Sequence, residues 1–147
     1  MPKRLLHVVI FILVTCQIGC GGGSVKVSEE PDKAGLENMD KFMRAYMDFC
    51  AKNNSAPRSL KDLEPFLKKY GDPQALSKSP NDGQPYVVHW GYNPNLYDFA
   101  EGAAPVVAYE KQGKDGQRWV FRADGVFKLS VEELKNSVFP PGFKPQF

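Results

Sequence analysis

The spacing of hydrophobic residues changes once along this sequence, near residue 86, and this change limits the fold class. Before it, apolar side chains recur every three or four residues, as on one face of an α-helix. The stripe consists of Leu36, Met39, Met43, Tyr46 and Cys50. Beyond residue 86 they recur every second residue, as on one face of a β-strand. Trp119, Phe121 and Ala123 alternate in this way with Arg118, Val120 and Arg122. Helices followed by paired strands predict an α+β domain.

Two helices are expected before the strands. The first runs from residue 33 or 34 to residue 52 and buries a broad apolar face. The second is short, with Ser59 as its N-cap and Asp62 as the capping partner. Pro65 requires this helix either to start late, so that the proline falls in its first turn, or to kink there. The segment Gly71-Asp72-Pro73 closes it.

Four strands are expected at residues 86–90, 105–110, 117–123 and 126–129. Asp115-Gly116 and Asp124-Gly125 separate the last three, and Asp-Gly between alternating apolar residues is a strong hairpin signal. The sequence therefore predicts an antiparallel meander. The first helix should cross one face of it. One core should then contain Phe42, Met43, Tyr46, Cys50, Leu63, Leu67, Trp119 and Phe121.

The chain after the meander begins with a capping box, Ser130 to Glu133, which starts a last helix over residues 131–136. The tail, residues 139–147, has no periodicity. Its Phe139, Phe143 and Phe147 either pack back on the sheet or offer a contact site.

The N-terminal segment is typical of an export signal. Lys3 and Arg4 precede an apolar run over residues 5–18, which is short for a membrane span. Gly19-Cys20 at its end resembles the lipobox of bacterial lipoproteins, although Gln17 stands where that family usually has Leu. The resemblance implies cleavage before Cys20 and a diacylglycerol on its sulfur. The alternative is a simple signal anchor with an accidental cysteine.

The organisation that follows is a signal peptide at residues 1–19, a lipidated cysteine and flexible tether at 20–33, one domain at 34–138 and the tail at 139–147. Loss of residues 1–19 would leave 17 of the 19 basic residues against 17 acidic ones. Such a neutral surface argues against nucleic acid as a partner. The residue after the cysteine is Gly21 rather than Asp, and in this the chain resembles lipoproteins that two-membrane bacteria sort to the outer membrane.

The domain also resembles the globular part of pseudopilins, the prepilin-type subunits of secretion systems. Residues 57–63 are similar to "P-x-S-L-x-x-L", and residues 80–88 are similar to the "DPWGNPY" loop without its Trp. Residues 122–130 resemble the C-terminal region known by an H-x9-DG pattern, whose His would fall at Lys114. Pseudopilins polymerise through an apolar helix continuous with the domain. Here that segment is expected to be removed, so we expect a monomer.

Residues that could support catalysis or metal binding are few. Cys50 lies on the apolar stripe of the first helix, where a free thiol behaves as a small hydrophobe. His89 is the only histidine after the signal and is expected to be half-buried in a strand. No Cys/His spacing suits zinc and no cofactor fingerprint occurs. Major pseudopilins bind calcium in a loop of this region, which makes Asp115 and Asp124 weak calcium candidates; the alternative is that they only stabilise their turns.

The remaining candidates are aromatic. Trp90, Tyr92, Tyr97 and Phe99 crowd the loop before the second hairpin, where they either form a platform for sugar or peptide or close an edge of the core. Partner contact is therefore expected at Tyr92, Tyr97, Phe99, Phe139, Phe143 and Phe147. We expect a non-enzymatic, lipid-anchored envelope module without a cofactor. The alternative is a small periplasmic hydrolase or an enzyme-inhibitor lipoprotein.

Overall fold

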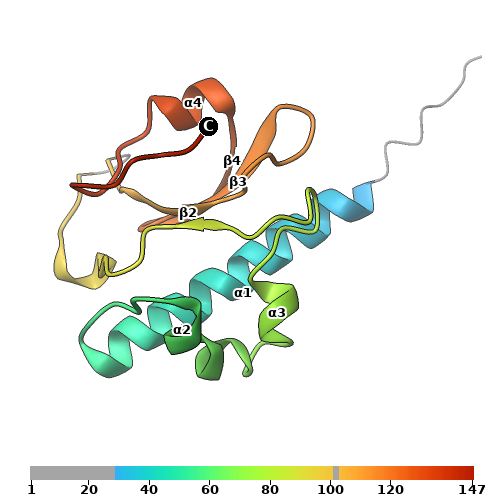
Figure 1. Ribbon diagram of the computed structural model, residues 1–147. Coiled ribbons are helices and arrows are strands. Elements are labelled where there is room, and N and C mark those ends of the chain that lie inside the picture. Colours follow the sequence, from blue (N-terminus) through green and yellow to red (C-terminus); the bar gives the residue numbers. More distant parts are fainter. Residues whose placement is uncertain (1–28, 101–102) are drawn as a thin grey trace, which may run out of the picture.

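The computed structural model describes residues 29–100 and 103–147, and the expected signal segment and Cys20 lie outside these residues. Over this part the chain is α+β, as expected. A four-stranded sheet has helix α1 (Glu29–Asn53) across one face and helix α4 (Val131–Lys135) with the C-terminal tail against the other (Figure 1). None of the helices in the described part has the length and apolar composition needed to cross a membrane.

Helix α1 begins at Glu29, four to five residues before the expected start. Its first turns are fastened to the sheet, because Trp119 Nε1 donates to Asp32 Oδ1 (3.2 Å) and Lys128 Nζ lies 2.7 Å from Asp32 Oδ2. Gly35 permits this approach, since a Cβ there would lie 2.7 Å from the Trp119 ring. Leu36 stays 37% exposed, so the apolar face that was expected to be buried is partly exposed at this end of the helix.

Two short helices follow. Ser59 Oγ accepts a hydrogen bond from Asp62 N and caps α2 (Leu60–Leu67), as predicted. Pro65 stands in the second turn of α2, so the late start is wrong. Helix α3 (Pro73–Leu76) was not predicted. Asp72 begins it by accepting from Ala75 N (3.0 Å), with Pro73 in the first turn, where its missing N–H costs nothing.

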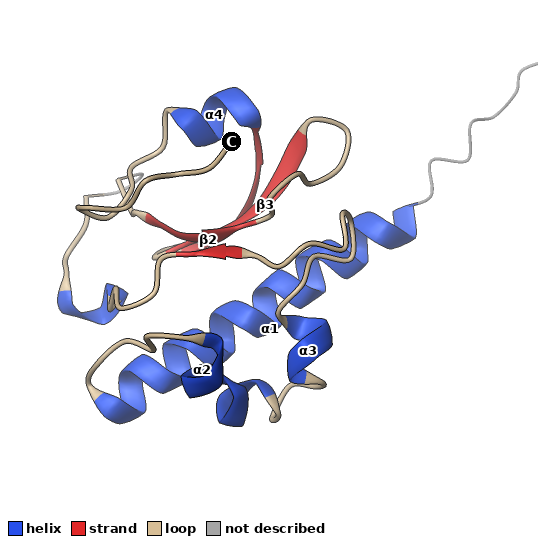
Figure 2. Cartoon of the chain, viewed as in Figure 1, coloured by secondary structure: helices blue, strands red, loops and turns tan. Residues whose placement is uncertain are grey.

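The sheet has the order β1-β2-β3-β4 with every neighbouring pair antiparallel. Its strands are drawn in red in Figure 2. Strand β1 (Val87–Val88) is shorter than the predicted strand at 86–90. Strands β2 (Val106–Tyr109), β3 (Gln117–Arg122) and β4 (Gly125–Ser130) form the expected meander. Asp115 and Gly116 both have positive φ, 53° and 74°, which suits the mirror-image turn that tight hairpins favour.

The capping box of α4 is confirmed. Glu133 N donates to Ser130 Oγ (3.2 Å), and Ser130 N donates to Glu133 Oε2 (2.8 Å). The helix ends at Lys135, one residue before the expected end, because Asn136 serves as its C-cap.

Two apolar clusters cover the two faces of the sheet. The first lies between α1, α2 and the sheet; it holds all eight predicted core residues, with Met43 and Trp119 only partly buried. The second lies on the other face and consists of Val106, Tyr109, Val120 and Leu134. Phe139 and Phe143 pack against this second cluster, so the tail folds back on the sheet. Burial on both faces explains why consecutive residues of β3 are buried.

Candidate functional site

The loop after β1 places three of the predicted contact residues in one stack. This loop contains a single 3-10 turn, η1 (Pro94–Leu96), capped by Asn93, whose Oδ1 accepts from Asn95 N (3.0 Å). The rings of Tyr92 and Tyr97 are nearly parallel, 9° apart, with centroids at 5.4 Å. The Phe99 ring lies 6.2 Å beyond Tyr97. The turn therefore aligns aromatic side chains that are several residues apart in the chain.

The tail places the other three around Tyr109 of β2. Ring centroids of Phe139, Phe143 and Phe147 lie 6.3, 6.5 and 6.3 Å from that of Tyr109. The Tyr109 hydroxyl also accepts from Gln146 N (2.7 Å) and donates to Gln146 O (3.0 Å). These two hydrogen bonds fix the end of the tail against the strand.

His89 joins the two groups. Its ring centroid lies 5.8 Å from that of Tyr92 and 5.0 Å from that of Phe143. The loop and the tail, some fifty residues apart in sequence, thus form one continuous set of rings. We call it the aromatic cluster: His89, Tyr92, Tyr97, Phe99, Tyr109, Phe139, Phe143 and Phe147. The half-buried position expected for His89 is confirmed, whereas its bridging role was not predicted.

Some rings of the aromatic cluster are buried in the domain, and others are exposed to solvent. Tyr92 and Tyr109 are buried, while Tyr97 and Phe147 are 55% and 51% exposed. Leu96, next to Tyr97, is 59% exposed. Large apolar side chains held outward by buried rings can make apolar contact without first losing conformational freedom. The arrangement therefore suits binding.

The electrostatics of His89 and Cys50 do not resemble those of a nucleophile and its base. Burial lowers the pKa of His89, so the imidazole is neutral at pH 7. Its Nδ1 is buried without a hydrogen-bond partner, and no carboxylate in the described part of the chain bonds to it. Burial raises the pKa of Cys50 to about 11, which keeps the thiol protonated within the first core.

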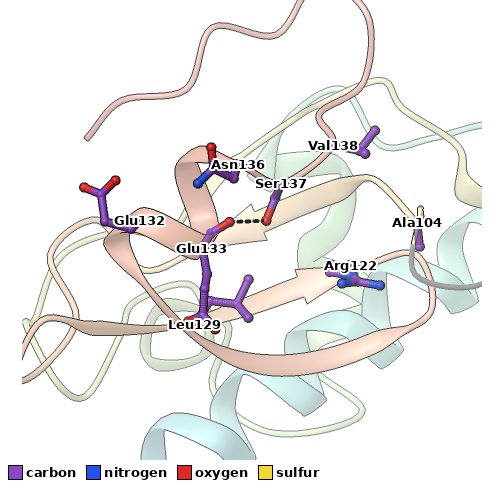
Figure 3. A pocket seen from close by; sticks show the side chains of 8 residues that line it. All are labelled: Ala104, Arg122, Leu129, Glu132, Glu133, Asn136, Ser137 and Val138. Atoms are coloured by element: carbon purple, nitrogen blue, oxygen red, sulfur yellow. Dashed lines mark hydrogen bonds between the residues drawn. The ribbon is translucent and has the colours of Figure 1, made fainter.

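Two of the pockets on the described surface are lined by charged or polar groups. One, of about 420 Å³, lies between α4 and strands β3 and β4 (Figure 3). Its Arg122 is bound by Asp124, at 2.6 Å, and its Glu133 has a pKa lowered by hydrogen bonds from Ser130. Figure 3 shows Glu132 on the side of the pocket away from Arg122. These charged groups serve the fold and do not converge on one point.

The second pocket, of about 270 Å³, adjoins the aromatic cluster. Tyr92 and Tyr97 form its aromatic wall, and Asn54, Arg58 and Asn93 supply polar groups. Asn54 directly follows the last residue of α1. The loop half of the aromatic cluster therefore lies at the C-terminal end of α1, opposite Glu29 (Figure 1).

The two calcium candidates lie apart. Asp115 precedes β3 and Asp124 follows it, so a strand of six residues, about 20 Å long, separates them. Asp124 is paired with Arg122, and Asp115 occupies the first central position of its turn. Within residues 29–100 and 103–147, no three His, Cys, Asp or Glu side chains gather in a way that could hold a metal ion.

The sequence pattern did not predict the burial of two charged residues, Glu110 and Arg118. Glu110, directly after β2, is 0% exposed and accepts from Ser79 Oγ (2.6 Å), Asn81 Nδ2 (2.9 Å) and Trp119 N (2.8 Å). Arg118 of β3 is 6% exposed. In the sequence, Arg118 alternates with the apolar residues of β3. A polar residue in such an alternation is expected to face solvent, so the pattern did not indicate burial.

Comparison of the chain with protein-family models, with curated proteins and with solved structures found no match.

Proposed function

We propose that this chain is a lipid-anchored module of the bacterial cell envelope that binds a protein partner through the aromatic cluster. The observation that carries the proposal is the meeting of the loop and the tail at His89, which turns two short apolar segments into one surface with Tyr97 and Phe147 exposed. Exposed aromatic side chains rimmed by polar groups are typical of protein interaction sites.

The anchor is proposed from the sequence. Lys3 and Arg4, the apolar run and Gly19-Cys20 are typical of an exported lipoprotein, and Gly21 favours the outer membrane. The position of the aromatic cluster supports a tethered role. Helix α1 has 25 residues, which at 1.5 Å per residue gives a rod of about 37 Å. The loop half of the aromatic cluster lies at the far end of this rod from Glu29, away from the proposed tether.

We further propose that the domain is related to the globular part of pseudopilins and acts as a monomer. Support comes from the order of elements: a long helix, a helix capped by Ser59, a meander, and a helix begun by a capping box at Ser130. The tail and α4 cover the face of the sheet opposite α1. The partner, on this proposal, is an envelope protein of a secretion or pilus machine.

The binding proposal is tested by photo-crosslinking in intact cells. A photoreactive phenylalanine analogue replaces Tyr97, Phe147 or, as the matched control, Phe127 of β4, which is 37% exposed and outside the aromatic cluster. We expect one common partner from positions 97 and 147 and none from position 127. Pilus-like subunits in that product would support the kinship as well. Equal labelling from all three positions, or none from 97 and 147, would contradict binding through the aromatic cluster.

The anchor is tested separately by Cys20→Ala. This change removes the sulfur that the proposal requires for lipidation, so the precursor should accumulate without fatty-acid label. Cys50→Ala is the control, since its buried thiol is not the proposed site. Label that persists in Cys20→Ala, or a mature N-terminus elsewhere, would sink the lipoprotein assignment.

A further inference from the structure

Arg118 is a buried cation, and two of its three guanidinium nitrogens have no partner. Its side chain lies in β3 and only 6% of the residue is exposed. Nε and Nη1 are fully covered and form no hydrogen bond. Arg118 is also absent from every salt bridge formed among residues 29–100 and 103–147.

The neighbours of Arg118 on its face of the sheet are apolar. Its cross-strand partner is Leu129, and Val120, two residues along the strand, lies on the same face. Val120 belongs to the second core together with Tyr109, and Leu129 packs against it. The turn before β3 folds over the stem of the arginine, because a Cβ on Gly113 would lie 2.8 Å from Arg118 Cγ.

That turn is held in place from outside the site. Asp82 Oδ2 accepts hydrogen bonds from Gln112 N and Gly113 N, both at 2.8 Å. Lys114 and Gln117 close the turn with two further main-chain bonds, each 2.9 Å long. The cover over Arg118 is therefore built from fixed main chain and supplies no anion to the guanidinium.

An unpaired buried charge is unfavourable, since the group loses hydration and gains no opposite charge in exchange. An apolar side chain of similar volume would fill the same space without that loss. The two unpartnered nitrogens are thus explained most simply by a ligand that supplies the missing acceptors.

We propose that Arg118 is a binding site for a carboxylate, a site distinct from the exposed rings of the aromatic cluster. A carboxylate presents two oxygens in one plane, which match two N–H groups along one edge of a guanidinium. It carries a single negative charge, which balances the one buried cation. A phosphate carries about −1.5 to −2 at pH 7 and would leave excess charge among Leu129, Val120 and Tyr109.

The test is thermal unfolding of the purified domain in sodium acetate, with sodium chloride and sodium phosphate at matched ionic strength. A ligand that binds only the folded state raises the melting temperature in a saturable way. We expect acetate to do so for the wild type. Arg118→Met should abolish the acetate effect and should melt higher than the wild type in chloride. Arg44→Met, which removes an exposed guanidinium of α1 outside the aromatic cluster, should leave the acetate effect unchanged.

A second measurement follows the Arg118 Nε–H resonance of the ¹⁵N-labelled wild type during the acetate titration, and it does not depend on the variant being folded. A saturable shift at Arg118, absent at Arg44, would support the site. No shift, no change in melting temperature with acetate, or an equal response to chloride would overturn it. Stabilisation by phosphate alone would overturn the carboxylate assignment. None of these outcomes depends on the crosslinking from Tyr97 and Phe147.

Discussion

Glu110 illustrates how one buried carboxyl group can set a pH dependence. Burial raises its pKa, while hydrogen bonds from Ser79, Trp119 and Asn81 oppose the rise. Because the folded-state pKa is above that of the unfolded chain, the folded protein binds the proton more tightly. The free energy of unfolding is then highest below the ordinary pKa of Glu and falls as the pH rises through the folded-state pKa.

We therefore predict that Glu110→Gln removes this part of the pH dependence. At neutral pH the free energy of unfolding of the variant should also fall by about 1–3 kcal/mol, since the amide group of Gln cannot accept all three hydrogen bonds. Urea unfolding at a series of pH values measures both effects. Glu132→Gln, at an exposed position of α4, is the control. A wild-type slope that persists in Glu110→Gln would assign the pH dependence to another group.

Residues whose role is local were predictable from sequence, and residues whose role depends on distant neighbours were not. Ser130 and Glu133 bond to each other across three residues, and Asp115-Gly116 sets its own turn. Glu110 is bonded to Ser79, 31 positions earlier in the chain. Nothing in the sequence pattern indicates that these two residues would be in contact. His89 was correctly expected to be half-buried, but its two ring neighbours come from separate segments.

At the scale of elements, α1 is fixed to the sheet at its first turns by Asp32. We predict that Asp32→Asn weakens this contact by about 1 kcal/mol, because the partly buried pair with Lys128 is lost. Hydrogen exchange should accelerate in the first two turns of α1 and stay unchanged beyond Phe42. Lys128→Met should reproduce the effect without altering the helix itself. Asp40→Asn, which breaks an exposed pair with Arg44, should leave those amides protected.

Element boundaries differed from the sequence expectation where tertiary contacts decide them. Helix α1 starts early because Asp32 has partners on β3 and β4. Strand β1 is short because the chain leaves the sheet at His89, whose N–H still bonds to Val107 O (2.8 Å). The strands β2, β3 and β4 were close to expectation, since Asp-Gly turns fix both their ends and their pairing.

For the whole molecule, the tail is part of the fold as well as of the proposed binding surface. We predict that deletion of residues 139–147 costs about 3–5 kcal/mol, since it removes Phe139 and Phe143 and uncovers the second core beneath them. Denaturant unfolding measures the loss, and a dye that binds apolar surface should report the opened face. Tyr109→Phe, which removes only the bonds to Gln146, should cost about 1 kcal/mol. Near-wild-type stability after the deletion would show that the tail is only peripheral.

Because both faces of the sheet are covered, the two cores form one after the other as the chain emerges. The N-terminal part of the chain emerges first, and the first core can close once α1 has been joined by β3 with Phe121. The second core must wait for Leu134 and then for Phe139 and Phe143. Until those residues arrive, Val106, Tyr109 and Val120 face water on the unfinished side. A chain truncated shortly before the tail would thus have one covered face of the sheet and one exposed apolar face that is prone to association.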